Sequence, residues 1–492
     1  MKKIEINPVT RLEGHAKIAI FLNDEGNVEN AYFQAPELRG FERFCQGRNA
    51  EEMPRITTSI CGVCPVAHHM AGAKVLDDLY NVEPTPTGEK IRKLMYNTYI
   101  FSDHVLHFFY LGAPDFYVGP DADPAKRNLL DMIEKVGLDF GKKVIKHRSY
   151  SQNILKTIGG DPIQPVNCMA GGVTKGLSGV ERQDIEKKAG ECLEFAKFAL
   201  KTFNDVVLEN EDYVELIKSD PYTLDTHYMG LVDENDHVNF YDGIVRAVDT
   251  SGDEIVRFEG QNYLDHIAEK VHDSWTYLKF PYLKEKGWKG IESGGESGIY
   301  RVGPLARLNA AEGMATPLAQ EEYGRMFEVL GGKPVHATLA YHWARLIEVL
   351  FAAERMVELA SDEDITRGEI RNIPEESPDE GVGVVEAARG TLIHHYKTNE
   401  RGVLEDVNVI VPTTQNNGGI CMAVEKAAKG VISGGEIDQG TLNRVEMAFR
   451  THDPCIACAT HSLPGSMPLE VLVYDSEQNE IARSSKGLDA GR

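Results

Sequence analysis

Cys61-Gly62-Val63-Cys64 and Cys455-Ile456-Ala457-Cys458 are the two stretches from which the fold of this chain can be predicted. Each C-x-x-C turn brings two thiolates to one side of the chain, and one pair alone indicates a redox dithiol or half of a zinc site. The pairs are 455 − 64 = 391 residues apart, whereas zinc ribbons place theirs about 15 to 20 residues apart. We therefore expect four thiolates from distant segments to meet at one buried centre that closes a large fold on itself. Thiolates suit nickel, iron, copper(I) or zinc, and an iron–sulfur cluster also takes four cysteines, so spacing leaves nickel, zinc and a cluster open.

Composition and charge exclude several classes of protein. The 492 residues include 52 basic and 76 acidic ones, a formal net charge of −24, which argues against a nucleic-acid partner and against adhesion to an anionic membrane. No apolar run approaches the roughly 18 residues of a membrane span, and the segment from Met1 to Pro8 becomes polar too early for a signal peptide. We predict a cytoplasmic protein without direct membrane insertion, whose cysteines are thiols rather than disulfides.

The pattern of apolar residues predicts an α+β fold. Alternation over residues 17–22 and 28–33, with turn residues between them, predicts an N-terminal β-hairpin. Helical spacing follows over about residues 53–110. Because no Gly/Ser linker interrupts the chain, we expect one large unit over residues 1–461 with a central helical bundle and peripheral β elements. The other expected elements are helices at 181–208, 321–359 and around Met422 and Leu442, a loop and strand at 381–396, a strand at 406–412, a hairpin at 468–483, and an irregular or β-containing insertion at about 220–300.

Further motifs around the cysteine pairs resemble those of a known family. His68 follows the first pair, and His461 follows the second. The other motifs lie in collinear order: Arg11-Leu12-Glu13-Gly14-His15, Arg39-Gly40-Phe41-Glu42, Ser102-Asp103-His104, Gly171-Gly172-Val173-Thr174-Lys175, Glu386-Ala387-Ala388-Arg389-Gly390, Val411-Pro412-Thr413-Thr414 and Asp453-Pro454. From about residue 5 to residue 461 the chain resembles the large, catalytic subunit of nickel–iron hydrogenases, most closely the soluble cytoplasmic branch. The resemblance implies the large-subunit fold and the reversible heterolytic cleavage of H2 to protons and electrons.

The resemblance implies a nickel–iron centre held by the four cysteines. In the family, nickel takes four cysteinates, and two of them bridge to an iron that carries carbon monoxide and cyanide. By motif, Cys61 and Cys455 would be the terminal nickel ligands, and Cys64 and Cys458 the bridging ones. The softness of the thiolates favours nickel, and their charge stabilises its higher oxidation states.

The same motifs contain charged residues that the resemblance places near this centre, one as a proton acceptor and the others as a fixed positive charge with its partners. Glu13 resembles the family's proton acceptor, because a carboxylate beside a metal thiolate can relay a proton once burial brings its pKa nearer neutrality. The alternative is that Glu13 pairs with Arg11 or caps the hairpin. Arg389 resembles the guanidinium over the open metal position, and Asp103 and Asp453 resemble the carboxylates that hold it. A structural ion-pair network is the alternative for these three.

Three further residues resemble positions that surround the metals. Pro412 and Thr413 resemble the residues around the diatomic ligands of the iron, with the threonine hydroxyl donating to a cyanide. His68 resembles the histidine that hydrogen-bonds a bridging sulfur and so tunes the metal. Ala388 stands where many members have proline, which leaves the backbone conformation beside Arg389 open.

The resemblance also implies a second metal, usually magnesium, near the C-terminal end of the domain. Its ligands would be Glu42, the backbone carbonyl of Val409 and the side chain of His461. Oxygen ligands suit this hard cation, whereas a histidine nitrogen is less typical. An exposed charge is the alternative interpretation of Glu42.

The family's maturation and partners follow from the same resemblance. Residues 462–492, 492 − 461 = 31 in number, match the extension that a maturation protease removes after the final histidine. Electrons must leave through an iron–sulfur small subunit, and then through further subunits of diaphorase, deazaflavin-binding or heterodisulfide reductase type. The remaining cysteines belong to no pair and are expected to be small buried residues: Cys45, Cys168, Cys192 and Cys421.

Three alternatives to a catalytic subunit remain. A hydrogen-sensing regulatory homologue would bind the same metals, but sensors usually lack a removable extension. A structural four-cysteine zinc protein is disfavoured by the spacing of the pairs. A quinone-reducing homologue would lack both cysteine pairs, which this chain has. Nickel and iron content separates these classes.

Overall fold

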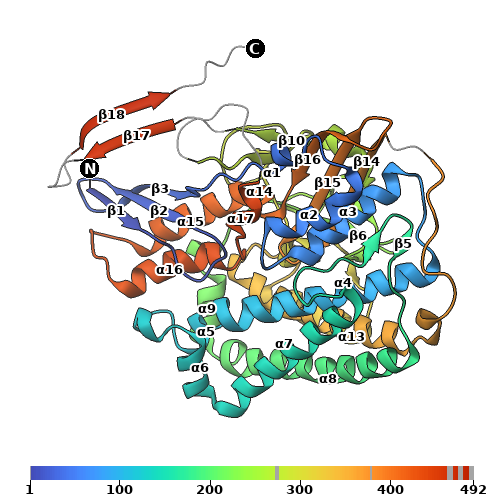
Figure 1. Ribbon diagram of the computed structural model, residues 1–492. Coiled ribbons are helices and arrows are strands. Elements are labelled where there is room, and N and C mark those ends of the chain that lie inside the picture. The colour runs from blue at the N-terminus through green and yellow to red at the C-terminus, as the bar shows by residue number, and fades with distance from the viewer. Residues whose placement is uncertain (1, 272–275, 377–378, 462–468, 475–479, 487–492) are drawn as a thin grey trace.

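Four long helices pack together in the lower half of the molecule as it is drawn in Figure 1. The computed structural model describes residues 2–271, 276–376, 379–461, 469–474 and 480–486. Helix α13 packs on α4 and α8, and α7 lies against the same two helices. Almost every side chain in the first half of α13 is buried, as expected for a helix that is surrounded by neighbours. The expected helical bundle is therefore present; its helices are α4 (Pro86–Leu106), α7 (Leu138–Gly159), α8 (Gly179–Phe203) and α13 (Tyr341–Ser361).

The N-terminal segment forms a three-stranded antiparallel sheet. Strands β2 (Lys17–Leu22) and β3 (Val28–Gln34) make the predicted hairpin, and β1 (Lys2–Ile6) pairs with the other edge of β2. The sequence pattern did not indicate β1, because four of its five side chains remain at least partly accessible. Helix α15 (Asn417–Val431) packs on β3, so segments from the two ends of the domain lie side by side.

A second antiparallel sheet carries much of the candidate site. Strand β15 (Gly390–Thr398) lies between β14 (Glu380–Ala387) and β16 (Leu404–Ile410). Residues 381–396 are thus a strand pair, whereas the sequence pattern indicated a loop and one strand. Helix α3 (Pro65–Leu79) packs directly on β14 and β15. Gly383 allows this approach, since a Cβ there would lie 2.3 Å from the carbonyl oxygen of Ala71.

The region around 220–300 contains a sheet of its own. Its strands follow the order β13-β7-β6-β8-β9, and β12 pairs with β6. The side chains of this sheet share a hydrophobic cluster with β14 and β15. The strands are β6 (His227–Val232), β7 (His237–Val238), β8 (Ile244–Val248), β9 (Glu254–Phe258), β12 (Tyr300–Arg301) and β13 (Gly313–Met314). Residues 272–275 of the expected insertion lie outside the described part of the chain.

The helical segment predicted over residues 321–359 is two helices, α12 (Pro317–Leu330) and α13. Gly331, with φ of +98°, ends α12, and Pro334 follows shortly after it. The remaining elements are α1 (Phe41–Cys45), α2 (Met53–Ile56), α5 (Pro114–Tyr117), α6 (Leu129–Val136), α9 (Glu211–Lys218), α10 (Tyr263–His266), α11 (Pro304–Ala310), α14 (Pro412–Gln415), α16 (Gln439–Arg450), α17 (Ile456–Ala459), β4 (Cys168–Met169), β5 (Gly172–Val173), β10 (Ile267–Lys270) and β11 (Phe280–Leu283).

The expected C-terminal hairpin is formed by β17 (Leu469–Tyr474) and β18 (Glu480–Lys486), which pair antiparallel. Residues 468 and 475–479 of that prediction lie outside the described residues. In Figure 1 the two strands stand apart from the main body, on the side of β1–β3. A search of the described helices finds none with the length and apolar character required to cross a bilayer.

Candidate metal centre

The structure brings the four cysteines of the two C-x-x-C pairs together. The Sγ atoms of Cys61 and Cys455 are 3.2 Å apart, and those of Cys64 and Cys458 are also 3.2 Å apart. The Sγ atoms of Cys455 and Cys458 are 2.8 Å apart, and all four sulfurs lie within 4.8 Å of one another. All four are buried free cysteines. The first pair lies in the loop before α3, and the second begins α17, so two distant turns face each other.

These sulfurs fit a soft metal ion. Burial raises the pKa of Cys455 and Cys458 well above the usual thiol value, because a buried thiolate has lost its hydration. A bound cation removes this penalty, since metal ligation deprotonates a thiol. A set of four sulfurs suits nickel, zinc or iron–sulfur chemistry. The donor set alone does not choose among these metals.

The carboxylate of Glu13 lies against the second cysteine pair. Its Oε2 accepts hydrogen bonds from the Cys455 thiol at 3.1 Å and from the backbone N–H of Ala457 at 3.0 Å. The alternative pairing of Glu13 with Arg11 is not observed, because the guanidinium of Arg11 bonds to Asp115 instead. The structure therefore places Glu13 beside the sulfurs.

The backbone conformation after Glu13 explains this contact. Gly14 has φ of +83°, and a Cβ there would lie 2.8 Å from the Cβ of Ile456. Only glycine permits both the left-handed conformation and the close approach of the two segments. Burial raises the pKa of Glu13, and a negative charge on Cys61 raises it further. The pKa of this carboxyl group therefore lies closer to neutral pH than that of an exposed glutamate.

Arg389 extends from the turn between β14 and β15 to the same centre. Its Nη1 and Nη2 donate to the two carboxylate oxygens of Asp103 at 3.0 and 3.2 Å. Its Nη2 is 2.9 Å from Oδ2 of Asp453, and its Nε donates to the backbone oxygen of Asp453 at 2.8 Å. Burial raises the pKa of Asp453 to about 7, while Arg389 opposes that shift. The three predicted residues thus form one buried ion-pair group.

Hydrogen bonds from other helices to its backbone fix the turn that carries Arg389. Ala388 donates its N–H to the hydroxyl of Tyr99 at 3.3 Å, a bond that a proline at this position could not make. Arg307 donates to the carbonyl oxygens of Ala387 and Ala388 at 2.9 and 3.3 Å. Neither Tyr99 nor Arg307 was predicted as a site residue.

Arg307→Leu is expected to destabilise the protein by about 3–5 kcal/mol, because it leaves the buried carboxylates of Glu348 and Glu386 without their counter-ion. The urea midpoint of the variant measures the effect. Arg367→Leu is the control, since the ion pairs of that arginine are exposed and contribute little. Equal midpoints for the two variants would contradict the structural role of Arg307.

A small cavity of about 10 Å³ adjoins the sulfurs. The hydroxyl oxygen of Thr413 accepts the backbone N–H of Cys455 at 3.0 Å, so its own proton remains to be donated. Pro412 begins helix α14 beside it. The cavity is lined by these and other residues of the site, among them Cys64, His68, Arg389 and Leu392.

His68 connects the sulfurs to two residues that were not predicted. Its Nε2 is 3.5 Å from the Sγ of Cys458, and its Nδ1 is 3.0 Å from Nε2 of His394. The Nδ1 of His394 is 2.6 Å from the hydroxyl of Tyr396. Burial lowers the pKa of His68 to about 4. Residues 394 and 396 share one face of β15, and this period of two was the available sequence signal.

The three residues predicted to bind a second metal also lie together. Oε1 of Glu42 accepts the backbone N–H of Val409 at 2.8 Å and is 3.4 Å from Nε2 of His461. That nitrogen also contacts the carbonyl oxygen of Val409. Burial, the largest single influence, raises the pKa of Glu42, but the hydrogen bonds from His461 and the Val409 N–H and the nearby positive charges together outweigh burial and lower it. Glu42 is therefore an inward-facing carboxylate and not an exposed charge.

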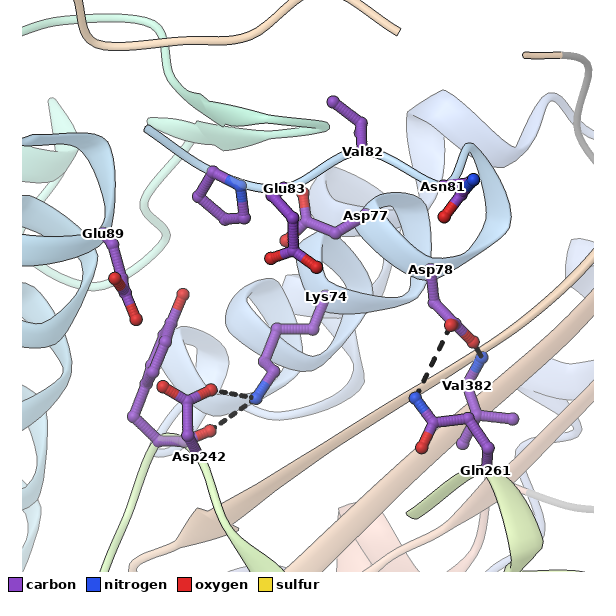
Figure 2. A pocket seen from close by; sticks show the side chains of 12 residues that line it. Lys74, Asp77, Asp78, Asn81, Val82, Glu83, Glu89, Asp242, Gln261 and Val382 are labelled. Carbon is purple, nitrogen blue, oxygen red and sulfur yellow. Dashed lines mark hydrogen bonds and ion pairs between the residues drawn. The ribbon is translucent and has the colours of Figure 1, made fainter. Parts of the chain in front are cut away.

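A wider polar pocket of about 240 Å³ lies elsewhere, beside α3 (Figure 2). Lys74 donates to Asp242 at 2.8 Å across it. Asp78 accepts the backbone N–H of Val382 at 2.7 Å and the amide of Gln261 at 3.5 Å. The pocket shares no lining residue with the cavity at the sulfurs, and Lys74 and Asp242 are already paired with each other.

Comparisons with known proteins agree with this geometry. The profile of the nickel-dependent hydrogenase family matches residues 39–133 and 143–461, and a HoxL-like profile matches residues 3–38. The chain is 50% identical to the iron–sulfur subunit of an F420-non-reducing hydrogenase from Archaeoglobus profundus, over 97% of this chain and 98% of that one. It is 39% identical to the beta subunit of the NAD-reducing hydrogenase HoxS from Cupriavidus necator, over 96% and 98% of the two chains.

Solved structures share the architecture. The crystal structure of an NAD+-reducing NiFe-hydrogenase in the H2-reduced state superposes with a TM-score of 0.88 at 37% identity, over 94% of this chain and 100% of that one. A NiFeSe-hydrogenase of Dm. baculatum shares the fold with a TM-score of 0.74 at 24% identity, over 94% and 100% of the two chains. The predicted α+β large-subunit fold and the resemblance seen in the motifs are confirmed. The chain belongs to the nickel-dependent hydrogenase family, as a large subunit with oxidoreductase activity on H2.

Proposed function

We propose that the four cysteines hold a nickel–iron pair, with carbon monoxide and cyanide on the iron, at which H2 is cleaved reversibly. Cys61 and Cys455 would hold the nickel alone, and Cys64 and Cys458 would hold the nickel and the iron together. The mutual contact of four buried sulfurs within 4.8 Å is the observation that carries this proposal. When bound, the metal pair supplies the Lewis acidity that polarises H2 and the redox capacity that accepts its electrons.

Glu13 is the proton acceptor in this proposal. Its Oε2 is 3.1 Å from the Sγ of Cys455, so a proton can pass from sulfur to carboxylate along an existing hydrogen bond. The backbone N–H of Ala457 holds the same oxygen in place. The raised pKa of Glu13 supports the role, because a general base works best when its pKa is near the operating pH.

Arg389 provides a fixed positive charge beside the cavity. A guanidinium stays protonated and cannot take the substrate proton, so it stabilises negative charge without entering the proton transfer. Asp103 and Asp453 hold its position. Thr413 would donate its hydroxyl proton to a cyanide, and Pro412 lines the cavity beside it. His68 would donate to the sulfur of Cys458.

Arg389→Lys is expected to retain nickel but to lower H2 oxidation per nickel by about 10²–10³-fold, the usual cost of losing a preorganised charged donor. Lysine keeps the charge but cannot bond both Asp103 and Asp453 with a planar fork. Hydrogen uptake normalised to nickel content measures the effect. Unchanged turnover would place Arg389 in a purely structural network.

Metal analysis and infrared spectroscopy test the centre itself. We expect nickel and iron at about one atom each per chain, and infrared bands from bound carbon monoxide and cyanide. Stoichiometric zinc without nickel would overturn the proposal in favour of a structural site. Turnover of H2 separates an enzyme from a sensing homologue with the same bands.

We also propose that Glu42, the carbonyl of Val409 and His461 bind magnesium, and that residues 462–492 are removed after His461. The carboxylate and carbonyl oxygens suit a hard cation, which keeps several waters. The buried contacts of His461 support an end of the folded domain at this residue. Strands β17 and β18, the described part of the extension, pair with each other.

Mass spectrometry of active, nickel-loaded protein is expected to give a chain that ends at His461. The expectation rests on the position of His461, which is buried and contacts Glu42 and Val409, so a chain that ends there would end inside the fold. Active protein that still ends at Arg492 would rule this out.

Partner proteins follow from the chemistry of the relatives. The Archaeoglobus profundus relative is named as one subunit of an F420-non-reducing hydrogenase, and the Cupriavidus necator relative as one of an NAD-reducing hydrogenase. We propose an iron–sulfur small subunit, further electron-transfer subunits of diaphorase, deazaflavin-binding or heterodisulfide reductase type, and a maturation protease, all in the cytoplasm. Co-purification of an iron–sulfur protein with the tagged native chain tests this assembly.

A further inference from the structure

We propose that Tyr396 and His394 fix which nitrogen of His68 carries the proton, so that His68 always presents an N–H to Cys458. Tyr396 and His394 are positioning residues, because they act on the centre through His68. The inference rests on the proposed function in one respect, the assignment of Cys458 as a metal ligand. The contacts run in an unbroken line from the hydroxyl through two imidazoles to the sulfur.

The direction of these hydrogen bonds follows from what each end can do. A metal-bound thiolate has no proton and can only accept, so Nε2 of His68 must donate to the Sγ of Cys458. A neutral imidazole has one N–H, which leaves Nδ1 of His68 as an acceptor. The facing Nε2 of His394, 3.0 Å away, must then be the donor. Nδ1 of His394 is consequently an acceptor, and the hydroxyl of Tyr396 is the donor that it requires.

Reversing the direction of these hydrogen bonds leaves two polar groups without a suitable partner. If His394 donated from Nδ1, the hydroxyl proton of Tyr396 would need an acceptor, and among the described residues His394 is the hydrogen-bond partner found for that oxygen. The lone pair of His68 Nε2 would then also face the sulfur of Cys458. A buried hydroxyl left without an acceptor is destabilising, so the first direction is preferred.

The surroundings keep the line in place. Tyr396, His394 and His68 are all at most 1% exposed, so water does not compete for their hydrogen bonds. Residues 394 and 396 occupy β15, the central strand of its sheet, and His68 lies on α3, which packs on that strand. Burial raises the pKa of Tyr396 well above its usual value, which keeps the donor proton on the hydroxyl.

An N–H donated to a ligand sulfur withdraws electron density from the metal and stabilises its reduced form. In Tyr396→Phe the ring is kept and only the donor is lost. Nδ1 of His394 then has no donor, so His394 can carry its proton on either nitrogen, and the tautomer of His68 is held from the sulfur side alone. We expect a lower midpoint potential of the nickel–iron centre, by up to a tenfold change in the redox equilibrium, which is about 59 mV for a one-electron couple.

Tyr263→Phe is the matched control. Tyr263 is also buried, and its hydroxyl is 2.9 Å from Nδ1 of His395, the neighbouring residue on the same strand. The other nitrogen of that imidazole bonds to Glu380 and not to a cysteine. Loss of this hydroxyl therefore removes the same kind of hydrogen bond, together with the one it accepts from Asn408, without reaching the sulfurs.

The closing experiment reads the hydrogen positions directly. Neutron diffraction of the native perdeuterated holoenzyme, or 15N NMR of histidine-labelled protein, is expected to find His68 and His394 both protonated at Nε2. A proton on Nδ1 of His68 in the native protein would overturn the proposal, as would equal potentials in Tyr396→Phe and Tyr263→Phe. The tautomer is read whether or not nickel is present, whereas metal analysis of the same sample tests the proposed function separately.

Discussion

Cys455→Ala is expected to release the nickel and abolish hydrogen oxidation. Cys455 contacts the sulfurs of both Cys61 and Cys458 and the carboxylate of Glu13, so one substitution removes a ligand and the start of the proton path. Residues that merely orient metal ligands already cost about 10–100-fold in affinity when they are replaced. The loss of a direct ligand is therefore expected to exceed about 100-fold. Nickel content of the purified variant and its hydrogen uptake measure the two effects.

Cys192→Ala is the control for this experiment. Cys192 is fully buried on α8 and belongs to neither pair, so its replacement removes a small buried side chain and leaves the four sulfurs unchanged. Retention of stoichiometric nickel in Cys455→Ala would show that the four sulfurs do not form one centre. Loss of nickel in both variants would point to general destabilisation instead.

Glu13→Gln is expected to retain the metals and to lower turnover by about 10²–10⁴-fold, the range attributed to a positioned general acid or base. Glutamine has nearly the same shape, and its amide oxygen can still accept the N–H of Ala457. It cannot take a proton from the thiol of Cys455, which is the step that the carboxylate serves. Hydrogen uptake and exchange of H2 with deuterated water, both normalised to nickel, measure the loss.

Glu5→Gln provides a comparison for Glu13→Gln. Glu5 lies on β1 and pairs with Lys3 at the surface, so the same chemical change there leaves the centre untouched. If Glu13→Gln turned over as fast per nickel as Glu5→Gln, the proton would leave by another route.

The kinds of donor atom and the residues that supply them were predictable from the sequence. Two cysteine pairs separated by 391 residues are too far apart for a local zinc knuckle, and softness restricts the metals that they suit. The left-handed conformation at Gly14 and the turn between β14 and β15 at Arg389 lie inside motifs that were interpreted as site motifs. These site residues could be predicted from short motifs because a turn brings residues that are close in the sequence together in space.

Contacts between distant segments were not predictable in the same way. The hydrogen-bonded line from Tyr396 to His68 passes between His394 and His68, which are 326 positions apart in the sequence. This contact exists because α3 packs on β15. Arg307 and Tyr99 hold the turn at Ala388 from two other helices, and no periodicity links them to it.

By itself, then, the sequence predicted the set of four cysteines, the family and the α+β class, because these depend on residue type and on motifs of short spacing. Only the tertiary structure decided which buried polar groups face the sulfurs and in which direction their hydrogen bonds run. The physical reason is that a buried hydrogen bond forms only where packing excludes water and sets the distance, and packing joins segments that have no regular spacing along the chain.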